Sequence, residues 1–466
     1  MKSPIPDYLS KVLDRVRDDT SGANADYIEA LAKADPDKMA VAVATVDGQV
    51  YSVGDDDVEF SMQSISKAFV YALAIEDRGL SGVLAKIGVE PSGDVFNKLS
   101  LESGTNKPMN PMINAGAITA HSLVGPADAT AEVRVARILK GMSMLAGREL
   151  KVDEAVYEAE MKDWHRNMGL GFMLKAAGII ECDPAEAVKG YIRQCSINVT
   201  VRDLAIMAGT LGNGGVHPVT GQRVIPSLSV RQVLSVMTTC GMYDAAGDWV
   251  SRVGIPAKSG VAGGIIGALP GQLGLAVFSP RLDKKGNSVR GMSMCEHLSN
   301  DMGMHMMDIT QVGRATVHTK VMTIAGGVKQ EGHELEIPIF ELRGAIRFAG
   351  AERFTRALVQ QLAVPSEARP THGKHHNACA IVFSLKEAYS LNDVAQKLLR
   401  EACWRVMSEG RRLVVIDPNR VLSLKGNDQL EKSPPKIVKS RQEARRYIGG
   451  AGCQKVSSHS DSGVDI

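Results

Sequence analysis

The sequence predicts an α/β (α+β) protein built from two domains. Residues 1–310 are expected to form an antiparallel sheet with a helical region inserted between its strands, and residues 318–446 a small α/β domain. The first expectation depends on strand patterns at both ends of the segment with mostly helical patterns between them. The second depends on strands that alternate with helices. The tail over residues 447–466, rich in glycine and serine, is expected to be disordered.

Composition excludes some classes of partner. The chain has 466 residues, of which 44% are hydrophobic and 23% charged, as in globular proteins with two or three domains. Lys and Arg total 54 against 52 Asp and Glu, and a net charge of +2 gives no reason to expect a nucleic-acid or membrane partner. Residues 1–8 lack the apolar region of a secretory signal, and the seven cysteines form no Cys-x-x-Cys pair. We therefore expect a cytoplasmic protein with free thiols.

The N-terminal segment is predicted to be helical and then to form a hairpin. Residues 8–33 have helical patterns, whereas 39–46 and 49–53 are predicted to be strands joined by Asp47-Gly48, which is typical of a type I′ turn. The acidic run over residues 55–57 follows a glycine and favours a solvated turn over a metal site. The hairpin directly precedes the first motif that indicates chemistry.

That motif is a Ser-x-x-Lys pattern, Ser64 to Lys67, at the first turn of a predicted helix. Residues three apart on a helix share one face, so the lysine can take the serine proton if burial keeps it neutral. Ser66 does not fit this role because adjacent residues on a helix point about 100° apart. The helix N-terminus favours negative charge on Ser64 and on a bound carbonyl oxygen. Gly79 is expected to end the helix.

The stretch from about 80 to 240 is mostly helical in pattern, with loops rich in glycine, proline and asparagine. Glu160 and Asn167 are seven residues apart, which on a helix is two turns along one face. That placement is suited to holding two ends of a small polar ligand. A solvated amphipathic helix is the alternative interpretation.

A second motif, Lys258-Ser259-Gly260, lies far downstream in a predicted strand, and residues 265–270 and 273–279 are predicted to be further strands. Ser-x-x-Lys followed by Lys-Ser-Gly is the signature of serine β-lactamases and penicillin-binding proteins, in which this strand lies along the nucleophile and offers a cation and a backbone N–H. The triplet Ser196-Ile197-Asn198 either supplies the Ser-x-Asn motif of these proteins or leads into a helix capped by Thr200.

Six segments carry a more specific resemblance. They are Gln63-Ser64-Ile65-Ser66-Lys67, Glu90-Pro91-Ser92-Gly93, Phe96-Asn97-Lys98-Leu99, Asn110-Pro111-Met112-Ile113-Asn114-Ala115-Gly116-Ala117-Ile118, Cys240-Gly241-Met242-Tyr243-Asp244 and Pro256-Ala257-Lys258-Ser259-Gly260-Val261-Ala262-Gly263-Gly264. In this order they resemble the serine-dependent glutaminases, a family with a β-lactamase-like fold. The resemblance covers residues from about 7 to 308.

The resemblance implies hydrolysis of L-glutamine to L-glutamate and ammonia, with no metal or organic cofactor. It implies Ser64 as nucleophile and Lys67 as general base, with Tyr27 and Tyr243 against the reacting centre and Lys258 as an electrostatic or strand-stabilising residue. The implied glutamine-binding residues are Ser64, Asn114, Glu160, Asn167, Tyr191, Tyr243 and Val261.

These residue types suit the substrate. Glu160 can hold the α-ammonium group, and Asn114, Asn167 and Tyr191 can hold the α-carboxylate. The backbone N–H groups of Ser64 and Val261 can form an oxyanion hole, typically worth ~3 kcal/mol per donor. The Trp164-His165 pair departs from the smaller residues common in the family at these positions. The expected intermediate is a γ-glutamyl ester on Ser64.

The second domain resembles a STAS domain, the sulfate-transporter and anti-sigma-antagonist module, with strands predicted near 320–327, 337–344, 378–384 and 412–417. In signalling members a phosphorylatable serine follows an aspartate at the start of a helix. Ser390 can match that serine, but Tyr389 replaces the aspartate, which counts against a phospho-switch. A ligand or protein partner and stabilisation of an oligomer are the other interpretations. The cluster His372, His375 and His376 favours a polar loop over a metal site.

Two alternatives to a glutaminase stay open from the sequence. One is a Ser-Lys acylase of another amide or ester, against which the Glu160 to Asn167 set and the absence of an export signal count. The other is a glutamine-sensing regulatory protein, against which the intact Ser64, Lys67 and Lys258 count. We expect the small molecule L-glutamine as the partner, no metal, and a homo-oligomer, either dimer or tetramer.

Overall fold

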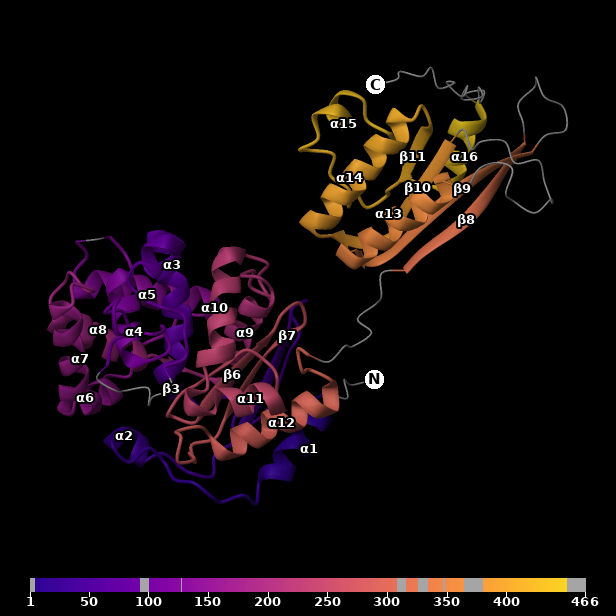
Figure 1. The fold of residues 1–466 in the computed structure, drawn as a ribbon. Coiled ribbons are helices and arrows are strands. Elements are labelled where there is room, and N and C mark those ends of the chain that lie inside the picture. The colour runs from indigo at the N-terminus through magenta and orange to yellow at the C-terminus, as the bar shows by residue number, and fades with distance from the viewer. Residues whose placement is uncertain are drawn as a thin grey trace. The chain divides into compact units, whose positions relative to one another are not determined.

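A computed structural model describes residues 5–92, 100–126, 128–307, 316–325, 334–346, 348–363 and 380–450. The chain divides into two compact units, Met1–Ile309 and Thr310–Ile466. Each unit has its own sheet and its own hydrophobic core (Figure 1).

The sheet of the first unit is antiparallel and has the strand order β2-β1-β7-β6-β5. Its strands are β1 (Ala40–Thr45), β2 (Val50–Gly54), β5 (Ala257–Ser259), β6 (Gly264–Leu269) and β7 (Leu273–Phe278). The predicted hairpin is confirmed, with Ala44 opposite Val50. The central pairing joins the two ends of the unit, because β1 lies beside β7 with Val43 opposite Leu275. The prediction that strands from both ends share one sheet is also confirmed.

Alternating side chains give this sheet two apolar faces, each covered by helices (Figure 1). Val41, Val43 and Val277 belong to the core shared with α1 (Ile5–Val16), α11 (Ala246–Arg252) and α12 (Val289–Met302). Ala40, Ala42 and Ala276 point to the other face, where α9 (Val201–Gly212) packs. The sheet is therefore the middle layer of the unit, and the helical region lies beyond α9.

The helical region and the short elements around it occupy the middle of the chain. Their bounds are α2 (Glu29–Ala32), β3 (Phe60–Ser61), η1 (Gln63–Ile65), α3 (Ser66–Leu84), α4 (Asn114–Leu123), α5 (Ala131–Ala146), α6 (Glu154–Lys162), α7 (His165–Ala176), α8 (Pro184–Cys195), β4 (Asn198–Val199), α10 (Ser227–Cys240) and η2 (Tyr243–Ala245). The predicted stop at Gly79 is a break within α3, where φ is 71°. Thr200 and Asp203 form a capping box at the start of α9.

One helical prediction is wrong. Glu160 and Asn167 do not share a helix, because α6 ends at Lys162 and α7 begins at His165. The chain leaves the helical conformation at Asp163, where φ is −125° and ψ is 44°. The two side chains therefore reach their common cavity from different helices.

The second unit has a sheet of order β12-β11-β10-β9-β8, in which β8 is antiparallel to β9 and the other neighbours are parallel. Its elements are β8 (Thr316–Ala325), β9 (Glu334–Ile346), α13 (Phe348–Ala363), β10 (Ala380–Leu391), α14 (Asp393–Ser408), β11 (Arg412–Ile416), α15 (Asp428–Lys432), β12 (Lys436–Val438) and α16 (Arg441–Gly450). α13, α14 and α15 share one core with the sheet, and α16 packs on the other face. The predicted alternation of strands and helices is confirmed.

Three details of this unit differ from the predictions or lie beyond them. Ser390 belongs to the end of β10, and Asn392 caps the helix that follows, so the serine does not begin a helix. α16 continues to Gly450, so the tail predicted to be disordered from 447 is helical in its first residues. The cluster His372, His375 and His376 lies outside the described residues. Among the residues that are described, no helix is both long and apolar enough to cross a bilayer.

Candidate active site

The Ser-x-x-Lys turn lies at the start of α3. Ser64 is on the short 3₁₀ turn η1 and is 7% exposed, and Lys67 follows as the second residue of α3. The backbone is helical from Ile65 onward, so the two side chains leave the same side of the turn. Gln63, just before the nucleophile position, has a φ of 50°, a conformation that non-glycine residues seldom adopt. Such strain is typical of functional sites.

Lys67 is fully buried, and Asn114 at the start of α4 holds its nitrogen. Lys67 Nζ donates to Asn114 Oδ1 over 2.7 Å. Burial lowers the pKa of Lys67 to about 8, against the opposing effect of the Cys195 and Glu160 side chains. A lysine with this pKa is partly neutral near physiological pH and can accept a proton.

The Lys-Ser-Gly strand β5 lies against the nucleophile turn. Gly260 makes this approach close, because a Cβ at that position would lie 2.9 Å from the Met62 carbonyl oxygen. Lys258 is fully buried, and its Nζ donates to the Ser259 carbonyl over 2.7 Å. Burial, and then the charge of Lys67, hold the pKa of Lys258 well below its usual range.

Tyr243 connects the strand to the nucleophile. Its hydroxyl donates to the Ser259 carbonyl over 3.3 Å and is hydrogen-bonded to Ser64. The nitrogen of Lys258 lies 4.2 Å from the centre of the Tyr243 ring. The φ of Tyr243 is 50°, so a second strained residue stands at the site. Burial raises the pKa of Tyr243 to about 12, which keeps its proton available for donation.

The opposite wall carries polar groups for a ligand. Gln63 Nε2 donates to Glu160 Oε1 over 2.7 Å, and Asn114 Nδ2 donates to Asn167 Oδ1 over 3.1 Å. The Tyr191 hydroxyl of α8 donates to Asn114 Oδ1 over 3.1 Å. Burial raises the pKa of Glu160 to about 7, although the hydrogen bond from Gln63 and the charge of Lys67 act in the opposite direction.

These residues line one cavity of about 880 Å³, a size suited to a small molecule. Of the predicted site residues, it brings together Tyr27, Ser64, Asn114, Glu160, Asn167, Tyr191 and Val261. Tyr27 lines the same cavity as Ser64, and 59% of its surface is exposed. Lys67, Tyr243 and Lys258 do not line the cavity themselves. Lys67 is hydrogen-bonded to Asn114, Tyr243 is hydrogen-bonded to Ser64, and Lys258 lies over the Tyr243 ring.

Among the residues of this cavity that sequence reasoning missed are Gln63 and Cys195. Gln63 directly precedes Ser64, and its position in the motif was the available signal for its contact with Glu160. Cys195 also lines the cavity and acts on the pKa of Lys67. As an isolated cysteine it gave no signal. By contrast, Asn198 of the Ser-x-Asn triplet donates to Asp153 and lies opposite Ser61 of β3, so its role is structural.

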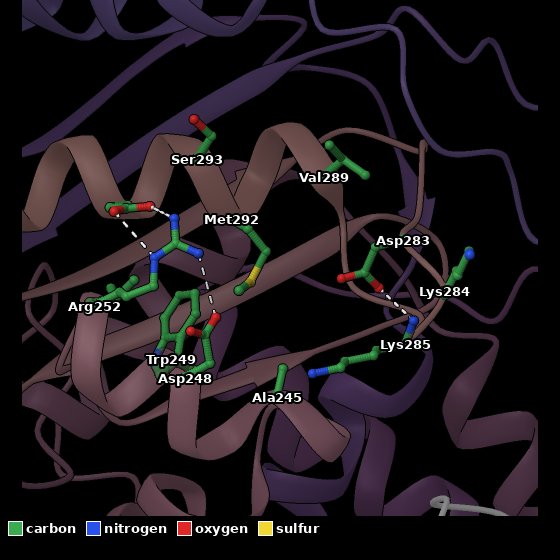
Figure 2. A pocket seen from close by; sticks show the side chains of 12 residues that line it. Ala245, Asp248, Trp249, Arg252, Asp283, Lys284, Lys285, Val289, Met292 and Ser293 are labelled. Atoms are coloured by element: carbon green, nitrogen blue, oxygen red, sulfur yellow. Dashed lines mark hydrogen bonds and ion pairs between the residues drawn. The ribbon is translucent and has the colours of Figure 1, made fainter.

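A second hollow of about 470 Å³ lies beside the loop that precedes α12 (Figure 2). Arg252 pairs there with Glu296 and Asp248, and the Lys285 side chain extends toward Ala245. None of the residues that sequence analysis assigned to the site line this hollow. We therefore place the chemistry in the larger cavity.

The larger cavity can perform one kind of chemistry well. It presents a serine hydroxyl three residues before a buried amine on one helical turn, a tyrosine able to donate a proton, and a carboxylate with amides that can hold a polar substrate. Such a set, in a protein with this sheet and helical region, defines a hydrolase.

Comparison with known proteins identifies the family. A family model described as Glutaminase matches residues 22–307, and the chain belongs to the glutaminase family. A glutaminase from Corynebacterium glutamicum is 46% identical over 419 residues, which is 90% of this chain and 95% of that protein. The prediction of an enzyme of the glutaminase class is thereby confirmed.

Two solved structures are similar to the chain. A structure of Mglu in its tris and glutamate form matches with a TM-score of 0.80 and 41% identity, over 91% of this chain and all of that one. A probable glutaminase from Bacillus subtilis, complexed with 6-diazo-5-oxo-L-norleucine, matches with a TM-score of 0.60 and 32% identity, over 66% of this chain and 98% of that one.

Proposed function

We propose that this protein hydrolyses L-glutamine to L-glutamate and ammonia through a γ-glutamyl ester on Ser64. The observation that carries the proposal is the fully buried Lys67, one helical turn after this serine, with its pKa lowered to about 8. Family membership and the glutamate named for the Mglu structure support the choice of substrate.

Glutamine would bind through its two charged ends. Glu160 lines the cavity and accepts a hydrogen bond from Gln63, the residue just before Ser64. Its carboxylate would hold the α-ammonium group. Asn167 and the amide nitrogen of Asn114 would hold the α-carboxylate, with Tyr191 fixing the orientation of Asn114. This binding would place the side-chain amide at Ser64.

The reaction would follow in balanced steps. Neutral Lys67 accepts the Ser64 proton while the serine oxygen attacks the amide carbon, and the backbone N–H groups of Ser64 and Val261 stabilise the oxyanion by ~3 kcal/mol each. Tyr243 donates its proton to the departing ammonia and regains one from the protonated lysine. A water molecule then attacks the ester carbon, and the same groups return the proton to Ser64 and release L-glutamate.

Ammonia release by the purified protein tests this function. Wild type should release ammonia from L-glutamine, Ser64→Ala should release none, and Ser235→Ala, a change at an exposed serine of α10, should match wild type. L-Asparagine and a chromogenic β-lactam serve as comparison substrates. Faster turnover of either comparison substrate than of L-glutamine would favour a Ser-Lys acylase of another amide or ester. Binding of glutamine without release of ammonia would favour a glutamine-sensing regulatory protein.

We also propose that the second unit is a STAS-like docking domain. Its five-stranded sheet with helices on both faces supports this assignment, and Tyr389 next to Ser390 is 69% exposed and available to a partner. If Ser390 is a phospho-switch, Ser390→Asp in the full chain should change the rate of ammonia release. An unchanged rate would argue against a phospho-switch and leave partner docking or stabilisation of an oligomer as the role of this unit.

A cytoplasmic location and self-association stay predictions. Size-exclusion chromatography with light scattering tests self-association.

A further inference from the structure

One wall of the active-site cavity is a stretch of chain that belongs to neither a helix nor a sheet. Every residue from Ser21 to Ile28 lines the cavity, and the only strand-like pairing described for this stretch is the bridge of Ala23 with Leu282. The stretch runs from α1, which packs beside α12, to α2, which packs beside α6 (Figure 1). We call residues 19–28 the wall segment. Because it has no ladder of backbone hydrogen bonds, its position depends on contacts with other parts of the unit.

Arg290, the second residue of α12, binds the chain on both sides of the wall segment. Its side chain is 2% exposed. Nε donates to the Asp19 carbonyl over 2.7 Å, and Nη2 donates to the Arg17 carbonyl over 2.9 Å. Nη1 donates to the Pro36 carbonyl over 3.5 Å. A guanidinium carries five N–H donors in a fixed planar arrangement, so this single side chain can hold several carbonyls at once.

Asp37 connects Arg290 to a second arginine. Asp37 Oδ1 accepts a hydrogen bond from Arg290 Nη2 over 3.2 Å and another from Arg281 Nη2 over 3.1 Å. Arg281 also donates through Nη1 to the Thr20 carbonyl over 3.2 Å. The residue after Arg281 is the one that bridges to the wall segment. We call Arg281, Arg290 and Asp37 the clasp, which binds the wall segment at its start and the chain on either side of it.

The clasp is separate from the reacting groups. None of its three residues lines the cavity, whereas the wall segment does. The nucleophile and its base belong to η1 and α3, and the hydrogen bonds described for the clasp do not reach those elements. The clasp can therefore act on a bound substrate only through the segment that it holds.

We propose that Arg281, Arg290 and Asp37 are positioning residues for glutamine binding, because they hold the wall segment where it closes one side of the cavity. The inference rests on the proposed function, in which glutamine is the ligand. Without the clasp, the wall segment also populates positions in which that side of the cavity is open. Binding must then restore the closed position, so the apparent affinity falls in proportion to the fraction of molecules that are closed. Once glutamine is bound the site is complete, so the rate at saturation stays the same.

Steady-state ammonia release by Arg290→Met and Asp37→Ala tests the proposal. Arg290→Met removes the carbonyl contacts together with the ion pair, and we expect KM to rise by about 5- to 20-fold with kcat within about twofold of wild type. Asp37→Ala removes only the link between the two arginines, and KM should rise by about 2- to 5-fold. The double variant should raise KM by less than the product of the two single effects, because both changes break one clasp.

Arg134→Met is the matched control. Arg134 on α5 is 3% exposed, and its Nε donates to the Ser122 carbonyl over 3.2 Å. Its loss removes another buried arginine that holds a backbone carbonyl, but one that does not bind the wall segment. We expect lower thermal stability with the KM of wild type. Asp37 has a side chain that is 64% exposed, so Asp37→Ala provides the test should Arg290→Met fail to fold.

Hydrogen exchange measured by mass spectrometry follows the wall segment without turnover. Peptides that cover residues 21–28 should exchange faster in folded Arg290→Met and Asp37→Ala than in wild type, and saturating L-glutamate should slow them again. Peptides that cover α5 should exchange as in wild type in both variants. This pattern would assign the kinetic effect to the wall segment rather than to a general loss of stability.

A wild-type KM and unchanged exchange of residues 21–28 in the folded variants overturn the proposal and leave the clasp a role in stability alone. A fall in kcat at constant KM overturns it as well, because the clasp would then act on the chemistry. Calorimetry of glutamine binding separates this proposal from the proposed function. Weaker binding and faster exchange in the variants of a protein that releases no ammonia would support the clasp and reject the proposed function.

Discussion

Replacing Glu160 with glutamine removes one negative charge from the cavity and little else. The substituted amide keeps the shape of the side chain, and its carbonyl oxygen can still accept the hydrogen bond from Gln63. Truncating one partner of a buried charge pair costs ~2–5 kcal/mol. Because Glu160 is half-buried, we expect the lower part of this range, a loss in kcat/KM of about 30- to 300-fold at about 1.36 kcal/mol per tenfold.

The pH profile gives the same prediction a second readout. In wild type both Glu160, with a pKa of about 7, and Lys67, with a pKa of about 8, must lose a proton before glutamine is bound and attacked. Log kcat/KM should therefore fall with a slope near two at low pH. In Glu160→Gln the slope should fall to one, and the single limb should lie below the position expected for Lys67, because the Glu160 charge that raises its pKa is absent.

A substrate lacking the α-amino group completes the cycle. Wild type should lose activity on glutaramate by a factor similar to that of the substitution, and Glu160→Gln should treat glutaramate and glutamine nearly alike. Ammonia release over pH 5 to 9 measures all four combinations. Equal kcat/KM for glutamine in wild type and variant, or a steep limb that survives the substitution, would refute the assignment of Glu160 to the ammonium group.

Three further predictions concern the strand beside the nucleophile and Tyr243, which donates a hydrogen bond to it. Tyr243→Phe should lower kcat by about 10²- to 10⁴-fold with little change in KM, as expected for loss of the proton donor, and a KM effect in steady-state assays would contradict that role. Lys258→Met should lower kcat, because the Ser259 carbonyl loses its hydrogen-bond donor. The acidic limb of the pH profile, assigned to Lys67, should stay within about half a pH unit of wild type. A larger shift would indicate that Lys258 tunes the site electrostatically. Gly260→Ala should cost ~1–3 kcal/mol of stability, since the new Cβ meets a backbone oxygen, and unchanged thermal unfolding would show that the strand can move away.

Most of the sheet of the first unit could be predicted because β1, β6 and β7 are short apolar runs next to glycine turns. Residues 264–269 and 273–278 carry this pattern, and Asp47-Gly48 marks the hairpin. The break between α6 and α7 could not be predicted. The segment around Asp163 contains no glycine or proline, and the helix ends there only through the local backbone conformation.

The active site likewise contains contacts that local sequence spacing predicts and contacts that it does not. Ser64 and Lys67 could be paired because three residues on a helical turn fix their relation. The contact of Gln63 with Glu160 and that of Gln194 with Ser66 join distant helices, and no spacing in the sequence records them. Local periodicity therefore predicts the nucleophile, and tertiary packing supplies the groups that act on its base.

The pairing of β1 with β7 has a consequence for how the chain folds. Val43 and Leu275 meet at the centre of the sheet, so the whole helical region is a loop that must close before these strands can pair. Closure of so long a loop is entropically costly, and contacts between residues distant in sequence slow folding. The Lys-Ser-Gly strand joins the sheet only through β6 and β7. A nascent chain that ends before β7 would therefore contain Ser64 and β5 but could not join β5 and β6 to β1. Activity should appear late in refolding, together with completion of the sheet.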